Sequence, residues 1–149
     1  MMTRTELLQF MKGHLNAVQA TVSSDGSPQA AVVGIAVTDF FEIVFDSLET
    51  TRKAANLLKN PRIAFVLGGW IPGDEQTLQY VGIVDHPQGA ELEAVKAIYY
   101  TRFPSGPARL AWPGILYLRA RPVWIRYTDF GKNPVQRVEL DTRQLQALA

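Results

Sequence analysis

Two adjacent cations at the start of an expected helix are the residues of this sequence best placed to do chemistry. Residues 50–60 (TTRKAANLLKN) have helical spacing, so Arg52 and Lys53 fall in the first turn. The helix dipole is positive there and unpaired backbone N–H groups point outward, so each cation costs on the order of 0.3–1 kcal/mol. A bound anion removes that cost, and a phosphate accepts hydrogen bonds from amides and cations alike. The pattern therefore indicates a phosphate-binding site.

Hydroxyl groups next to the two cations could complete such a site. Ser47, Thr50 and Thr51 precede the expected helix, and their O–H groups can donate to phosphate oxygens. Two alternatives stay open. The cations extend into water, or the carboxylates of Asp46 and Glu49 just upstream neutralise them. The choice depends on whether those carboxylates face the same side as the cations.

Length and composition restrict the kind of protein that presents this site. With 149 residues, of which 47% are hydrophobic, the chain fits one domain spanning residues 1–149. The 15 basic and 14 acidic side chains leave a net charge of +1, which selects no polyanionic partner. The absence of cysteine excludes disulfides, thiolate metal sites and thiol nucleophiles. No stretch reaches the roughly 18 apolar residues of a membrane helix and no signal-peptide core is visible, so we expect a soluble cytoplasmic protein.

Short strands dominate the expected secondary structure. Alternation and turn residues predict strands over 15–22, 29–37, 41–45, 62–67, 77–84, 115–118 and 123–127. Helical spacing predicts helices over about ten residues before Gly13, over 50–60 with Ala54, Leu57 and Leu58 on one stripe, and over 87–100. Gly82, inside a strand, indicates a bend or a close backbone approach. Because most connections are hairpin-length, we predict a mainly β fold with flanking helices, a small closed or split antiparallel barrel.

The segment from Phe41 to Phe65, FEIVFDSLETTRKAANLLKNPRIAF, resembles the signature of the pyridoxamine 5'-phosphate oxidase-like, FMN-binding split-barrel superfamily. In that family a strand ends in a hydroxyl-rich turn, followed by Arg-Lys, a short helix and Asn-Pro-Arg at the next strand. Trp70, Gly82 and the closing PVWIRY of residues 122–127 are also similar to family features. The resemblance implies a six-stranded antiparallel Greek-key split β-barrel.

The same resemblance implies a homodimer with two FMN molecules in the grooves between subunits. Arg52 and Lys53 would hold the flavin phosphate with help from the hydroxyls, and the backbone of Val33, Gly34 and Ile35 would line the ring. Related barrels also imply a deazaflavin of the F420 type or haem as alternative cofactors. The chain lacks the C-terminal Arg-x-His pair of the vitamin B6 oxidases, which places it nearer the general FMN-binding branch.

Large aromatic and basic side chains are further candidates for the ligand site. Trp70 and Trp112 can stack on a flavin ring, although packing in the core or at an interface is the more common role for such side chains. Arg109 and Arg126 could reach the partner subunit's flavin or bind an anionic substrate over it. Single-stranded nucleic-acid binding on the basic segment 101–138 is disfavoured, because the remaining surface is acidic.

The sequence assigns no catalytic acid, base or nucleophile. It has no G-x-S-x-G elbow, and His14 and His86 lack a neighbouring ligand pattern, so no metal site is expected. We therefore expect an FMN-binding, flavin-dependent oxidoreductase that passes hydride through flavin N5 to or from a small-molecule substrate. The alternative is a binding module of the same fold that holds flavin or haem without turnover.

Overall fold

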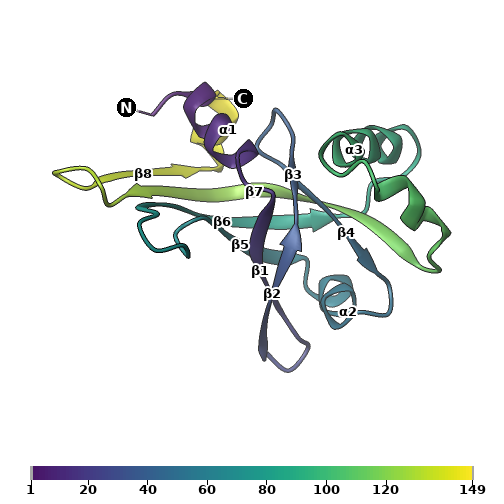
Figure 1. Ribbon diagram of the computed structural model, residues 1–149. Helices are drawn as coiled ribbons and strands as arrows, with labels where there is room; N and C mark the ends of the chain where they lie inside the picture. Colours follow the sequence, from purple (N-terminus) through teal and green to yellow (C-terminus); the bar gives the residue numbers. More distant parts are fainter. Residues whose placement is uncertain (1, 149) are drawn as a thin grey trace.

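The computed structural model describes residues 2–148 and centres on one antiparallel β-sheet (Figure 1). The strands are β1 (Asn16–Val22), β2 (Pro28–Gly34), β3 (Ala36–Val37), β4 (Ile43–Leu48), β5 (Arg62–Leu67), β6 (Gln76–Asp85), β7 (Ile115–Asp129) and β8 (Gln136–Asp141). The helices are α1 (Arg4–Lys12), α2 (Arg52–Lys59), α3 (Gly89–Arg102), the 3-10 helix η1 (Gly106–Ala111) and α4 (Thr142–Leu148).

The sheet curls back on itself as a barrel. Its hydrogen-bonded order is β2-β1-β5-β6-β7-β4-β3, with β8 added alongside β7. Only Ile35 separates β2 from β3, so the two act as one bent strand that pairs with β1 on one side and β4 on the other. Counted in this way, six strands complete the circuit, which confirms the predicted split barrel. The hairpin of β7 and β8 extends beyond it as an arm (Figure 1).

Two helices cover opposite ends of the barrel. α1 buries Leu7, Leu8 and Met11 in the core at the end where β1 begins. α2 lies at the other end, where the side-chain amide of Asn56 donates to Thr21 Oγ1 at 3.0 Å (Figure 1). None of the helices formed by residues 2–148 has the length and apolarity needed to span a membrane.

The third long helix, α3, packs on the outside of the barrel. Its Val95 and Tyr99 meet Val44 of β4 and Tyr117 of β7 in a second apolar cluster, separate from the barrel core. Side chains alternate across a strand, so β4 can supply both clusters. Phe45 points into the barrel core, while its neighbour Val44 points toward α3.

Local sequence signals explain where α1 begins and why a glycine lies inside β6. Thr3 is the N-cap of α1 and forms a capping box, in which Glu6 N donates to Thr3 Oγ1 and Thr3 N donates to Glu6 Oε2. Gly82 lies at a register shift between β6 and β7, and a Cβ there would stand 2.8 Å from the carbonyl oxygen of Arg121. The predicted close approach at Gly82 is confirmed.

Other predictions about the elements were wrong. The expected strands 115–118 and 123–127 form the single strand β7, because the bulge at Gly82 lets pairing continue past Pro122. Leu58 is 72% exposed, since Asn56 takes the buried position to reach Thr21. β8 and α4 were not predicted. β8 alternates exposed and half-buried residues, so it has no buried apolar face to mark it as a strand.

Candidate functional site

The N-terminus of α2 presents the two cations at the surface. Thr51 is the N-cap, and its Oγ1 accepts from Ala54 N at 3.3 Å. Arg52 is exposed, Lys53 is half-buried, and the first turn holds no acidic residue. The first intrahelical bond runs from Ala55 N to Thr51 O at 3.1 Å, so the N–H groups of Arg52 and Lys53 lie ahead of it and point outward. This terminus offers backbone and side-chain donors together.

The carboxylates upstream of α2 do not neutralise these cations. Asp46 Oδ2 pairs with Arg109 Nη1 at 2.7 Å. Glu49 lies against Gly114, whose carbonyl oxygen accepts from Glu49 N at 2.8 Å. Within residues 2–148, no carboxylate oxygen comes within 4.0 Å of a side-chain nitrogen of Arg52 or Lys53. A direct ion pair with Asp46 or Glu49 is therefore excluded, so the two cations contact either water or a bound anion.

The three hydroxyls near the cations have different roles. The hydroxyl oxygens of Ser47 and Thr51 are 2.8 Å apart, and Thr51 Oγ1 donates to Leu48 O at 2.8 Å. Ser47 is buried, whereas Thr50 is exposed. Ser47 and Thr51 thus fix the turn that leads into α2, and Thr50 faces outward beside the cations.

Arg109 belongs to a polar pair on the outer face of β4. Asp46, its partner, lies on the side of β4 opposite Ser47. The guanidinium carbon of Arg109 is 5.9 Å from the ring centre of Tyr99, which is buried. Burial, together with the charge of Asp46, raises the pKa of Tyr99 to about 12. Arg109 is therefore committed to an ion pair within the chain.

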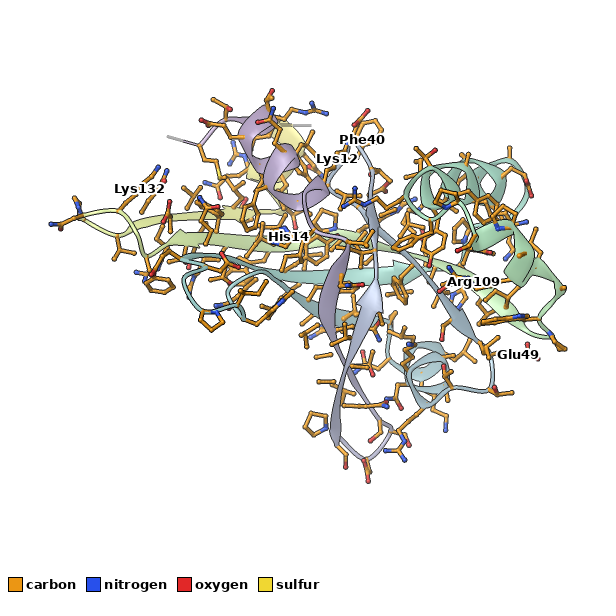
Figure 2. The ribbon with its side chains drawn as sticks, in the orientation of Figure 1. Lys12, His14, Phe40, Glu49, Arg109 and Lys132 are labelled. Atoms are coloured by element: carbon orange, nitrogen blue, oxygen red, sulfur yellow. The ribbon has the colours of Figure 1, made fainter. Side chains whose placement is uncertain are left out.

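The segment that carries Trp112 lies beside the turn before α2. Trp112 is 52% exposed and precedes Gly114, the residue that bonds to Glu49. Figure 2 shows Arg109 and Glu49 on this same edge of the molecule. The structure therefore brings Trp112 toward the cationic terminus, although 60 positions separate Trp112 from Arg52 in the sequence.

The predicted ring-lining residues offer backbone rather than side chains. Val33 and Ile35 point into the barrel core and are buried. Gly34 faces the other way, where a Cβ would stand 2.8 Å from Cζ of Phe103. Phe103 therefore covers the Gly34 face in this chain, and only the peptide groups of this segment could contact a planar ring.

Trp70 and Arg126 lie away from the α2 terminus of the same chain. The start of β5 adjoins α2, and Trp70 follows the end of β5. A six-residue strand spans about 17 Å, and this length separates Trp70 from α2. Its ring centre is 6.5 Å from that of His14. Arg126 pairs with Glu139 of β8 and lies over the ring of Trp124 at 5.2 Å.

Sequence reasoning missed a cavity of about 400 Å³ between α1, β3 and α3. Lys12, Asp39 and Arg102 contribute charged side chains to its lining, and Ile98 contributes an apolar one. The strand and the two helices that form it are distant in the sequence, so no local pattern marks the cavity. The sequence shows only the cations at its two helix ends, Lys12 and Arg102, each in a last turn.

The curled barrel and a cationic helix terminus define a split-barrel protein with donors suited to a phosphate group. A sequence profile described as "Pyridoxamine 5'-phosphate oxidase" matches residues 3–129, and the chain belongs to that family. A pyridoxine/pyridoxamine 5'-phosphate oxidase of Cupriavidus metallidurans is 33% identical over 123 residues, covering 77% of this chain and 55% of the relative. The chain thus spans about half the length of this relative.

Two solved structures are similar in fold. A haem-binding protein from Mycobacterium smegmatis superposes with a TM-score of 0.82 at 16% identity, covering 99% of this chain and 61% of that one. A pyridoxamine 5'-phosphate oxidase-related, FMN-binding protein from Nostoc punctiforme gives 0.66 at 12% identity, covering 95% and 86%. At these identities the likeness establishes the fold alone.

Proposed function

We propose that this protein binds FMN and acts as a flavin-dependent oxidoreductase on a small substrate. The observation that carries the proposal is the pair Arg52 and Lys53 in the first turn of α2, which has no acidic partner among residues 2–148. A phosphate at this terminus accepts from two backbone N–H groups and two cations. The family and the FMN-binding relative from Nostoc punctiforme support FMN as the phosphate-bearing ligand.

This chain would bind and orient the cofactor rather than supply a strong acid or base. Arg52, Lys53 and Thr50 would hold the phosphate, while Ser47 and Thr51 keep the helix terminus in place. Backbone groups of 33–35 would support the ring. When bound, FMN supplies hydride transfer at its N5 atom.

We also propose that two copies of the chain share the flavin sites as a homodimer. Trp70 and Arg126 do not reach the α2 terminus of their own chain, so a second copy would supply them. The outward faces of β2, β1 and β5 support such pairing. Val32, Val18 and Val66 are neighbours in register there, and Val32 is 70% exposed. Exposed apolar side chains in a continuous row are typical of interfaces.

Titration of the purified protein with FMN and with riboflavin tests the proposal. Riboflavin has the same ring and no phosphate, so we expect FMN to bind at least tenfold more tightly. Equal affinity for the two flavins would contradict a phosphate site at α2. Anaerobic bleaching of the bound flavin by NADH or NADPH would then distinguish an oxidoreductase from a carrier.

A second candidate function is a non-catalytic module that holds flavin or haem. His14 Nδ1 lies 2.8 Å from the carbonyl oxygen of Phe10, which can only accept, so Nδ1 carries the hydrogen and Nε2 is left as the basic nitrogen that could bind iron. The haem-binding protein from Mycobacterium smegmatis supports this candidate. The absorbance spectrum separates the two, because haem gives a Soret band and flavin a yellow colour.

A further inference from the structure

The cavity between α1, β3 and α3 combines an apolar interior with a charged rim. Its volume is about 400 Å³; residues 35–37 line it beside the barrel core, and the half-buried Ile98 adds an apolar side chain. Lys12 and Arg102 contribute the cations, from the last turns of α1 and α3. Cavities of this size and character hold small organic molecules.

Most of the polar groups around the cavity already have partners. Lys12 Nζ is paired with Asp39 Oδ1 at 2.5 Å, so its charge is compensated. The hydroxyl of Thr101 donates to Ala97 O at 2.9 Å. The hydroxyl of Thr38 donates to a side-chain oxygen of Glu42 at 3.1 Å. His14 donates through Nδ1 to a backbone carbonyl.

Arg102 is the exception. Over residues 2–148, no carboxylate oxygen lies within 4.0 Å of its guanidinium nitrogens. The arginines that the sequence suggested for an anionic substrate, Arg109 and Arg126, are both held in ion pairs. Arg102 is exposed, so the mouth of the cavity has one positive charge without a carboxylate partner.

We propose that this cavity binds a small organic carboxylate with an apolar body, held by the guanidinium of Arg102. A carboxylate carries one negative charge in a flat group that matches the guanidinium fork, whereas a phosphate dianion would keep one charge unpaired. The apolar part of the ligand would lie against Ile98 and the backbone of residues 35–37. The identification of this ligand as the substrate rests on the proposed function, since Ile35 belongs to the segment proposed to line the flavin ring.

Ligand-observed NMR on the flavin-free protein tests the binding step by itself. The probes are phenylacetate, its neutral analogue phenylacetamide, and phenyl phosphate. We expect phenylacetate to bind at least tenfold more tightly than the amide and more tightly than the phosphate. A preference for phenyl phosphate, or equal binding of acid and amide, would overturn the assignment.

Substitutions locate the site. Arg102→Ala should weaken phenylacetate binding at least tenfold, and Arg102→Lys should retain part of it. Arg137→Ala, which removes an exposed arginine on β8, is the matched control and should change nothing. Circular dichroism of each variant verifies folding. Unchanged binding in Arg102→Ala would overturn the proposal.

A parallel FMN titration separates the two proposals. Flavin binding without carboxylate binding refutes the cavity assignment and leaves the proposed function standing. Carboxylate binding without flavin binding refutes the proposed function and supports the cavity as a binding site. If both bind, phenylacetate should shift the visible spectrum of the bound flavin, and an unshifted spectrum would overturn its identification as the substrate.

Discussion

The carboxylate of Asp46 lies 2.7 Å from the guanidinium of Arg109, on the face of β4 opposite Ser47. This ion pair joins η1 to β4, and it commits one of the two acidic side chains just upstream of α2 to Arg109. Asp46 is therefore not a direct partner of Arg52 or Lys53 in the candidate phosphate site.

Replacing Asp46 by asparagine should weaken this arrangement. Arg109 would keep its partial burial and lose its counter-charge, so we expect a destabilisation of about 1–3 kcal/mol. The pKa of Tyr99 should also fall below its value of about 12, because Asp46 contributes to raising it, while burial keeps it above 10. Urea unfolding and NMR titration of ring-labelled tyrosine measure the two effects. An unaltered Tyr99 titration would contradict the contact.

Alkaline pH should destabilise the fold through Tyr99. The unfolded side chain ionises near pH 10, whereas the folded one keeps its proton up to about pH 12. The stabilisation is therefore complete below pH 10 and is lost as pH rises from about 10 to 12. Denaturant midpoints measured between pH 8 and 11 should fall, and Tyr99→Phe should make the fall shallower. The same slope in both proteins would argue against this source.

Replacing Gly34 by a larger residue should lower the stability of the fold. A Cβ there would stand 2.8 Å from the ring of Phe103, so Gly34→Ala should cost about 1–3 kcal/mol in unfolding free energy. Combining it with Phe103→Leu should recover part of that loss, because the smaller side chain can move aside. Strictly additive effects in this double-mutant cycle would show that the two residues do not interact.

The N-cap of α2 should contribute to stability through its hydroxyl. Thr51→Ala removes the acceptor for Ala54 N and should cost about 0.5–2 kcal/mol, whereas Thr51→Ser should be close to wild type. Thermal unfolding of the three proteins makes the comparison. Equal losses in both variants would assign the effect to the methyl group instead.

Features with a local cause were predictable from the sequence. The helix before Gly13, the strand 62–67 and a helix within 50–60 depend on neighbouring residues, and the structure contains all three. The exposed position of Leu58 was not predictable, because it follows from a bond between Asn56 and Thr21, 35 positions away.

The candidate site also contains residues that the sequence could predict and residues that it could not. Arg52 and Lys53 could be assigned to the first turn of a helix, because the helical spacing of a short sequence segment predicts that helix and its positive end. The partner of Arg109 did not, because 63 positions separate it from Asp46 and only the folded η1 brings them together. The cavity at Arg102 depends likewise on the assembly of three distant elements.

The proposed phosphate site depends most on the cations of α2, and the FMN affinity of the double variant Arg52→Ala/Lys53→Ala tests them most directly. Each charge-assisted hydrogen bond is worth roughly 1.5–3 kcal/mol, so we predict more than tenfold weaker FMN binding in a folded protein. Lys59→Ala, in the last turn of the same helix, should bind FMN like the wild type. Unchanged FMN affinity in the double variant would contradict the central claim.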